Sequence, residues 1–305
     1  MKVGVVGGSG FIGSHLVDKL VEEGHEVTVF DIMRPHREDV RHVTVDLLDF
    51  HRLVISMAGT YDAIYLLAAM ANVDHIYKNP VETSLVNIQG VANVIEAMRR
   101  YGGRLILAST VWVYNLAADQ SSVMREDSPL LVQNVNHTYT ASKVAAELLI
   151  HSCHQLYDLE FTILRYGIPY GPRGREGTLL TNFVQRGLKG QPISIFGDGA
   201  QARNFIYVED LAAGNVAALQ ENAKNQIFNL DGMRPVTIKE VAETVGDLID
   251  DVQIDYLPGR PGDHAVNTTS SNEKALELLG WAPEVDLKDG VKRYLDWYRT
   301  NVLGS

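Results

Sequence analysis

Tyr139 and Lys143 are four residues apart in a segment whose apolar spacing predicts a helix. Their side chains therefore share one helix face, about a turn apart. An unperturbed tyrosine has a pKa of about 10 and is a poor base at neutral pH, but a neighbouring cation favours its phenolate. The pair could therefore accept the proton of an alcohol or sugar hydroxyl. The same spacing is common on ordinary helix surfaces, so this interpretation needs a second motif.

That second motif is a glycine-rich segment between a strand-like run, Lys2 to Val6, and a helical pattern, Phe11 to Glu23. Glycines let the backbone approach a pyrophosphate closely, and the helix N-terminus offers N–H groups and partial positive charge. Asp31 ends the next strand, Glu26 to Phe30, where a carboxylate can accept hydrogen bonds from an adenine-ribose diol. The pattern predicts a dinucleotide site that uses Gly7, Gly10, Phe11, Ile12, Gly13 and Asp31.

Asp31 also bears on the choice of dinucleotide, because its carboxylate would repel a 2′-phosphate and accept a hydrogen bond from a 2′-hydroxyl. NAD is therefore favoured over NADP. Arg34 is close in sequence and could accept a 2′-phosphate, which leaves NADP as the alternative. An oxidised nicotinamide near Tyr139 would favour the phenolate further.

Composition limits the remaining possibilities. The chain has 305 residues and a net charge of −11, which argues against a nucleic-acid partner because phosphates would be repelled at long range. The single cysteine, Cys153, excludes an internal disulfide and suits a reducing compartment. We see no signal peptide, and the longest apolar stretch, Ala63 to Ala71, is too short to span a bilayer. We expect a soluble, cytoplasmic protein with no membrane partner.

Strand-like runs alternate with helical patterns along the first half of the chain, which predicts an α/β fold with a doubly wound parallel sheet. The predicted strands include 43–45, 63–67, 105–109 and 161–165, and the clearest helices are 87–100 and 139–156. From residue 167 the chain becomes rich in Gly, Pro and Arg. We expect a Rossmann domain at 1–168, rejoined by about 204–220, and a smaller α/β substrate-binding lobe at 169–305.

Taken together, these motifs resemble the extended short-chain dehydrogenases/reductases, specifically the NAD-dependent nucleotide-sugar epimerases and dehydratases, in the manner of UDP-glucose 4-epimerases. The resemblance implies Thr110, Tyr139 and Lys143 as the catalytic residues. It is carried by the glycine turn, Asp46-Leu47, Leu67-Ala68-Ala69, Asn87-Ile88-Gln89-Gly90, Ser109 to Tyr114, Tyr139 with Lys143, Leu164-Arg165-Tyr166, Tyr170-Gly171-Pro172, Phe196-Gly197-Asp198-Gly199, Arg203 with Tyr207-Val208-Glu209-Asp210, and Arg260-Pro261-Gly262-Asp263.

The resemblance also implies the binding residues. The cofactor would contact Asp46, Leu47, Leu67, Ala68, Ala69, Asn87, Tyr139, Lys143 and Tyr166 in addition to the glycine turn. A nucleotide-diphosphate sugar would contact Thr110, Tyr139, Phe196, Arg203, Arg260 and Asp263, with the arginine forks suited to phosphate oxygens. Ile168 and Ala71 depart from residues that many 4-epimerases have, so the particular sugar stays open.

The two residues after Thr110 discriminate among reactions. Family dehydratases have an Asp-Glu pair and glucuronate decarboxylases a Glu here, whereas this chain has Val111 and Trp112, which cannot transfer a proton like a carboxylic acid. We expect 4-epimerisation of a UDP- or dTDP-hexose or hexuronate, in which C4 is oxidised by NAD and hydride returns to the other face. The alternatives are a decarboxylase, a 4-ketosugar reductase, or a non-catalytic NAD- or nucleotide-sensing protein.

Two further expectations concern metals and assembly. His151, Cys153 and His154 lack a fourth partner at metal-ligand spacing, so we expect no metal. The family pairs helices equivalent to 87–100 and 141–156 across a dimer axis. Their apolar residues on more than one face, among them Val94, Ile95, Met98, Leu148 and Leu149, suggest a homodimer with a four-helix interface.

Overall fold

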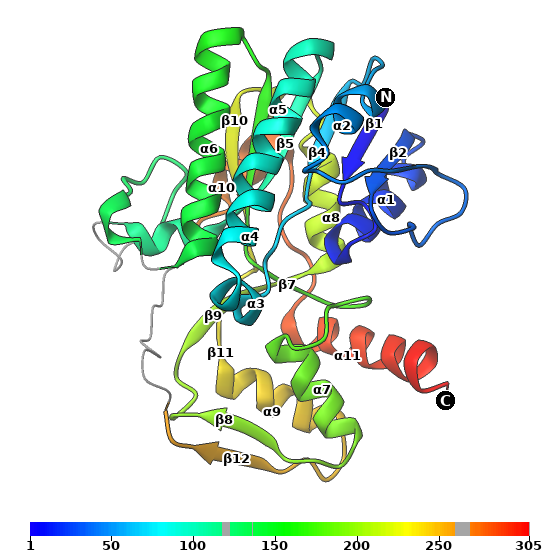
Figure 1. Cartoon of the computed structure of the whole chain (residues 1–305). Helices are drawn as coiled ribbons and strands as arrows, with labels where there is room; N and C mark the ends of the chain where they lie inside the picture. Colours follow the sequence, from blue (N-terminus) through cyan, green and yellow to red (C-terminus); the bar gives the residue numbers. More distant parts are fainter. Residues whose placement is uncertain (118–122, 136, 260–268, 305) are drawn as a thin grey trace.

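The computed structural model describes residues 1–117, 123–135, 137–259 and 269–304, which form two lobes (Figure 1). The larger lobe contains a seven-stranded sheet, β3-β2-β1-β4-β5-β6-β10, in which all neighbouring strands are parallel. The strand order reverses between β1 and β4, which confirms the predicted doubly wound fold. The strands are β1 (Lys2–Val6), β2 (Glu26–Asp31), β3 (Arg41–Thr44), β4 (Ala63–Leu66), β5 (Arg104–Thr110), β6 (Phe161–Tyr166) and β10 (Gln226–Leu230).

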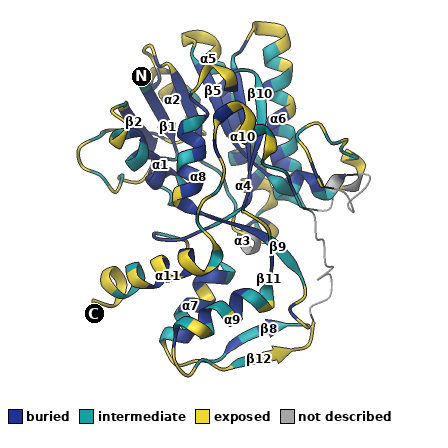
Figure 2. Ribbon diagram, turned by 180° about the vertical axis from the view of Figure 1, so that it is seen from behind, coloured by how far each residue is buried: buried dark blue, intermediate teal, exposed yellow. Residues whose placement is uncertain are grey.

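Helices cover both faces of this sheet, so β4, β5 and β6 are buried along their whole length and β1 is buried beyond its first residue (Figure 2). Successive residues of β5 face opposite sides: Ile106 belongs to one hydrophobic core and Leu107 to the other. The first core includes residues of α1 (Phe11–Glu22), α8 (Val208–Ala217) and α10 (Glu273–Leu279), and the second includes residues of α2 (Phe50–Ser56), α5 (Gly90–Tyr101) and α6 (Thr138–Tyr157).

The predicted elements correspond to the observed ones with shifted ends. The strand expected at 43–45 is β3, which begins two residues earlier and ends at Thr44, and the helix expected at 139–156 is α6. The helix expected from Asn87 instead opens with a π turn, η1 (Leu85–Gln89), before α5 continues to Tyr101. Such single π turns inside helices often occur at functional sites.

The smaller lobe packs around its own hydrophobic core, below the large sheet in Figure 1. It has a three-stranded sheet, β11-β9-β7, and a parallel pair, β12-β8. Its elements are β7 (Ile168–Tyr170), β8 (Ile193–Phe196), β9 (Ala202–Tyr207), β11 (Pro235–Thr237), β12 (Ile254–Leu257), α7 (Leu179–Leu188), α9 (Ile238–Leu248) and α11 (Leu287–Tyr298).

The chain returns to the larger lobe after β9. Leu211 and Val216 of α8 share a core with Leu16 and Leu20 of α1. The return extends beyond the predicted segment 204–220, because β10 pairs with β6 at the sheet edge and α10 also joins this core. The lobes are therefore connected by several passages of one chain.

The remaining elements are short, and among the described residues no helix is long and apolar enough to cross a membrane. They are α3 (Val73–Lys78), α4 (Pro80–Ser84), the 3₁₀ turns η2 (Val111–Leu116), η3 (Val132–Asn134) and η4 (Glu221–Ala223), and the π turn η5 (Arg299–Leu303).

Candidate active site

The turn after β1 has a shape that side chains would block. Gly7 has a φ of +87°, and a Cβ atom there would lie 2.5 Å from the backbone nitrogen of Ala68. A Cβ atom on Gly13 would lie 2.1 Å from the Gly7 carbonyl oxygen. Gly10 forms the N-cap of α1 without a side-chain hydrogen bond, so the N–H groups of the first turn remain available to an anion. The turn therefore fits a dinucleotide pyrophosphate.

Asp31 lies at the other side of this turn with its carboxylate held in place. Its Oδ2 accepts a hydrogen bond from the backbone N–H of Ser9 at 3.0 Å, and its Oδ1 accepts one from Met33 at 2.9 Å. The carboxylate lines the cavity described below, whereas Arg34 is exposed and does not line it. This geometry suits a ribose diol, which would contact the Asp31 carboxylate and not the Arg34 guanidinium.

A cavity of about 520 Å³ extends from this turn along the carboxyl ends of the strands. A cavity at this position, where the strand order reverses, is typical of ligand sites in open α/β sheets. The predicted cofactor residues that line it are Gly7, Gly10, Phe11, Ile12, Gly13, Asp31, Asp46, Leu47, Leu67, Ala68, Ala69, Tyr139, Lys143 and Tyr166.

Asn87 is the predicted cofactor residue that does not line this cavity. Its side-chain oxygen accepts a hydrogen bond from Met70 N at 2.8 Å, and its nitrogen donates to Met70 O and to Ser142 Oγ. Met70 itself lines the cavity, and Ser142 lies on α6 beside Lys143. In the structure, Asn87 thus positions the cavity wall from behind.

Tyr139 and Lys143 meet at the end of β5. Lys143 Nζ donates a hydrogen bond to the Ala108 carbonyl oxygen at 2.8 Å and lies 5.7 Å from the centre of the Tyr139 ring. Burial raises the pKa of Tyr139 to about 12, and the nearby Arg175 opposes this rise. Burial also lowers the pKa of Lys143 to about 8, against the effect of Glu147. Further positive charge beside Tyr139 is therefore needed to favour its phenolate.

Thr110 is less directly placed than the resemblance implied. It is buried, and its Oγ1 accepts a hydrogen bond from Trp112 N at 3.2 Å, which caps η2. Its neighbours Ala108 and Ser109 line the cavity, whereas Thr110 does not. The hydroxyl can still donate its own proton, because this contact uses only a lone pair of the oxygen.

Aromatic rings stand beside Tyr139. The Trp112 ring meets the Tyr139 ring edge-on, with centroids 6.0 Å apart, and the His137 ring meets both. Among the described residues, no cluster of three or more His, Cys, Asp or Glu side chains could hold a metal ion.

The predicted nucleotide-sugar residues of the smaller lobe are further from this centre. Arg203 lies on β9 and donates to the Ala202 carbonyl oxygen at 2.7 Å, and Phe196 ends β8. Neither lines the cavity. Arg260 and Asp263 lie outside the described residues.

Sequence reasoning did not find Arg175, which lines the cavity and acts electrostatically on Tyr139. It lies in the loop 171–178, three residues after the Tyr170-Gly171-Pro172 motif, and the motif itself does not predict a functional arginine there. Sequence reasoning likewise did not single out Ser109 and Met70 as cavity residues.

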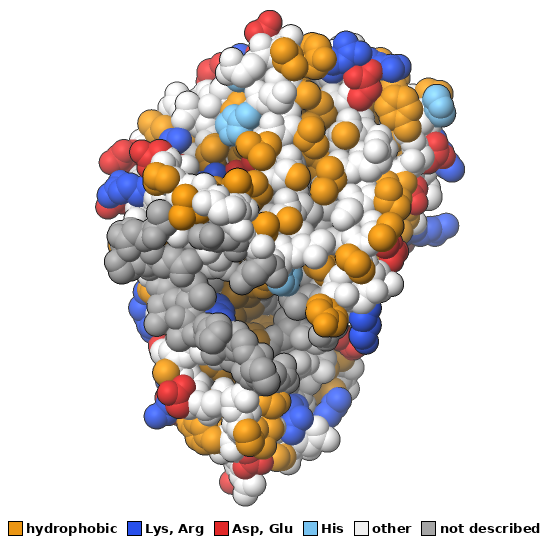
Figure 3. Space-filling model, turned by 60° about the vertical axis from the view of Figure 1, so that its left-hand side comes forward, with side chains coloured by type: hydrophobic (Ala, Val, Ile, Leu, Met, Phe, Trp, Pro, Cys, Tyr) orange, Lys and Arg blue, Asp and Glu red, His pale blue; other side chains and the backbone are white. Residues whose placement is uncertain are grey.

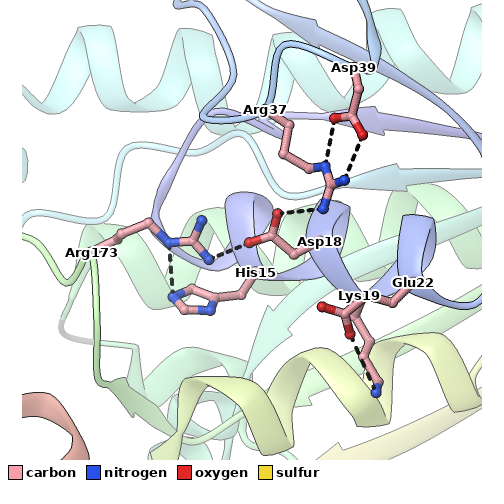
Figure 4. Close-up of polar contacts among 7 residues, drawn as sticks. All are labelled: His15, Asp18, Lys19, Glu22, Arg37, Asp39 and Arg173. Carbon is pink, nitrogen blue, oxygen red and sulfur yellow. Dashed lines mark hydrogen bonds and ion pairs between the residues drawn. The ribbon is translucent and has the colours of Figure 1, made fainter. Parts of the chain in front are cut away.

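The loop 171–178 is anchored to α1 by contacts at two successive residues, Pro172 and Arg173, of which Figure 4 shows Arg173 beside Asp18 and His15. Arg173 donates to Asp18 at 2.7 Å. His15 Nε2 lies 2.8 Å from the Pro172 carbonyl oxygen, which can only accept, so Nε2 carries the proton and is not free to accept from Arg173. Burial and then Arg173 lower the pKa of His15 to about 4, so this histidine is neutral at physiological pH.

The chain is similar to known proteins along most of its length. Residues 3–231 match the model of the NAD dependent epimerase/dehydratase family. A UDP-glucuronate 4-epimerase of Thermodesulfobacterium geofontis is 33% identical over 98% of this chain and 96% of its own. The UDP-glucuronic acid decarboxylase 1 of Arabidopsis thaliana is 34% identical over 100% of this chain and 71% of its own.

A solved structure supports the cofactor. The UDP-glucose 4-epimerase of Thermus thermophilus, in complex with NAD, is similar with a TM-score of 0.87 and 31% identity, covering 99% of this chain and 100% of that one. The cofactor of these proteins is NAD, which the residues around the glycine turn fit, and the chain belongs to the NAD-dependent epimerase/dehydratase family.

Proposed function

We propose that this chain is a nucleotide-sugar 4-epimerase, which inverts C4 of a UDP- or dTDP-linked hexuronate or hexose. The observation that carries the proposal is the position of Tyr139 and Lys143 on the wall of the NAD cavity, without a carboxylic acid at the two positions after Thr110. The relative named UDP-glucuronate 4-epimerase supports the same reaction.

Tyr139, Lys143 and Thr110 would each have a separate role in this reaction. Tyr139 accepts the proton of the C4 hydroxyl and later returns it, and the Lys143 cation stabilises the phenolate between these events. Thr110 donates a hydrogen bond to the sugar oxygen. The glycine turn and Asp31 would hold NAD, which would supply reversible hydride transfer at C4 with no net oxidation of the sugar.

The alternatives differ in what they consume or release. A decarboxylase is supported by the Arabidopsis relative but would need an unusual acid, because Val111 and Trp112 cannot transfer a proton. A one-way 4-ketosugar reductase would consume reduced cofactor in proportion to product. A non-catalytic NAD- or nucleotide-sensing protein would have no use for Tyr139 and Lys143 side by side on the cavity wall.

Arg175 favours a hexuronate among these sugars. Among the described residues that line the cavity, Arg175 is the single arginine. Its charge partly offsets the rise that burial causes in the pKa of Tyr139. A sugar whose C4 meets Tyr139 carries its C5 substituent on the next carbon, so a carboxylate there would lie within reach of this part of the wall. A guanidinium binds a carboxylate through two parallel hydrogen bonds.

We propose that the nucleotide diphosphate is held from the smaller lobe. Phe196 would hold the base, Arg203 and Arg260 would contact phosphate oxygens, and Asp263 would contact the ribose. The acidic net charge of the chain makes such local cations necessary for a diphosphate ligand.

We propose a homodimer formed through α5 and α6. Three of the candidate interface residues, Val94, Ile95 and Met98, are buried within one protomer, and of these only Ile95 lines the groove described below. Leu148 and Leu156 of α6 remain 60% and 66% exposed, beside a groove between the two helices. Figure 3 shows hydrophobic side chains gathered on the upper lobe. The groove is lined by Ala92, Ile95, Glu96, Arg99, Leu149, Cys153 and Tyr157.

A reducing compartment, the cytoplasm, is the proposed location. Cys153 is the sole cysteine of the sequence and lies partly buried on α6, so no disulfide supports the fold.

The first prediction concerns the Asp31 carboxylate. NAD should bind at least about tenfold more tightly than NADP, a difference of about 1.4 kcal/mol, because the carboxylate repels a 2′-phosphate. Asp31→Asn keeps the shape and removes the charge, so the ratio should fall towards one. The exposed Asp39→Asn is the control. Calorimetry with both dinucleotides measures the ratio, and equal affinities in the parent protein would refute this role of Asp31.

The second prediction tests the reaction. UDP-glucuronate, UDP-glucose and dTDP-glucose incubated with the NAD-loaded enzyme should show inversion at C4 by NMR for at least one sugar, without a change in carbon count or redox state. Tyr139→Phe should reduce turnover at least about 100-fold while NAD still binds, since it removes the transferable proton and little volume. A 4-keto-6-deoxy product, or a pentose with CO₂, would mean a different branch of the family.

The third prediction concerns Arg175. Arg175→Met should raise KM for UDP-glucuronate by roughly 10- to 100-fold, the effect of losing a charge-assisted hydrogen bond, and should change KM for UDP-glucose much less. Arg234→Met, at an exposed arginine paired with Glu240, is the matched control. An equal effect on both sugars would show that Arg175 does not read a carboxylate.

The fourth prediction concerns assembly. Light scattering at micromolar concentration should give twice the chain mass, and Leu148→Asp should give the monomer because a carboxylate would be buried in the interface. Leu276→Asp changes an exposed leucine of α10 and should leave the dimer intact. A monomeric parent protein would rule out this interface.

A further inference from the structure

A buried ion network lies behind Tyr139 and Lys143. Glu147 follows Lys143 by one turn of α6 and is bound by Arg165 of β6 through two contacts, Nη2 to Oε2 at 2.8 Å and Nε to Oε1 at 3.2 Å. The two side chains are only 7% and 5% exposed. Ser109, which lines the NAD cavity, donates its hydroxyl to the same carboxylate. The network therefore connects the cavity wall to the interior of the sheet.

This network contains two basic side chains, Lys143 and Arg165, and one carboxylate, Glu147. The Glu147 carboxylate, one turn of α6 from Lys143, pairs with Arg165. Glu147 also accepts from Ser109, the neighbour of the Ala108 whose carbonyl oxygen accepts from Lys143. Burial alone disfavours the ammonium form of Lys143, whereas the negative charge of Glu147 one turn away favours it. An arginine does not lose its proton in proteins, so Lys143 is the cation that can respond when the balance changes.

The other groups around this centre do not supply a replacement anion. Tyr139 and Tyr114 have pKa values raised to about 12 by burial, and burial raises the pKa of Tyr166 as well, so all three are neutral at physiological pH. Arg175 adds a further cation near Tyr139. The Glu126 carboxylate accepts from the backbone N–H of Asn229, and the Glu126 carbonyl oxygen accepts from Arg165.

We propose that Glu147 is a positioning residue that keeps Lys143 protonated, and that Arg165 and Ser109 hold its carboxylate in place for this task. The catalytic consequence rests on the proposed function, because only a charged Lys143 stabilises the Tyr139 phenolate. The electrostatic claim itself does not depend on which sugar is the substrate.

The direct test is a titration of Lys143 in the NAD-loaded protein. Lysine labelled with ¹³C at Cε reports the ionisation by NMR, and Lys143→Met identifies the signal. Glu147→Gln keeps the shape and removes the charge, and the Lys143 pKa should fall by at least about one unit, or tenfold in the protonation equilibrium. Glu147→Asp should restore most of it. Glu96→Gln, a half-exposed glutamate on α5, is the control.

An unchanged Lys143 pKa in folded Glu147→Gln overturns the proposal. If this variant does not fold, because Arg165 is left as a buried unpaired charge, the double variant Glu147→Gln/Arg165→Met removes both charges. The pKa should fall there too, since Glu147 is the charged side chain that raises it. A Lys143 pKa equal to that of the parent protein in the double variant again overturns the proposal.

A kinetic measurement separates this role from a structural one. A lowered pKa means that Lys143 loses its charge at a lower pH, so the alkaline limb of the kcat profile should move to lower pH while KM stays within about twofold. Absence of C4 inversion by the parent enzyme would refute the proposed function and leave the NMR result interpretable. A shifted Lys143 pKa with an unmoved alkaline limb would refute the catalytic part of this inference alone.

Discussion

The hydrogen bond from Lys143 Nζ to the Ala108 carbonyl oxygen joins the two elements on which the active site depends, helix α6 and the end of strand β5. It fixes the lysine against the strand and so places the helix face that also carries Tyr139. Because the amine is buried, its charge depends on the few groups packed around it rather than on solvent. The chemistry at the cavity wall is thus a property of the sheet interior as well as of the wall itself.

The cofactor side of the site could be predicted closely from the sequence, because its constraints are local. Gly7 and Gly13 occupy positions where any Cβ atom would collide with backbone, and such positions leave a glycine pattern that is visible without a structure. Asp31 ends a strand, and its distance along the chain from the turn is fixed by one helix and one strand. The shape of the glycine turn and the position of Asp31 can therefore be predicted from a short sequence motif.

Other features of the site and the fold depend on contacts between segments that are distant in the sequence. The spacing of residues along the chain does not reveal such contacts. Arg175 lines the same cavity as Tyr139, and the loop that carries it is fastened to α1 through Arg173 and Asp18. The π turn at Asn87 and the return of β10 to the sheet are likewise settled by tertiary packing. Thr110 shows the converse: its motif predicted a catalytic hydroxyl, but the structure also gives that oxygen a capping role that sequence alone cannot weigh.

Trp112 lies in the short turn η2, after the last residue of β5, and its ring is only partly buried. It belongs to neither of the two cores that hold the sheet together. The residue at this position can therefore change without disturbing either core, and the proposed catalytic residues Tyr139 and Lys143 lie on a separate element, α6. Such separation gives a scaffold evolvability: new reactions can arise by drift at one turn, without passing through unstable intermediates.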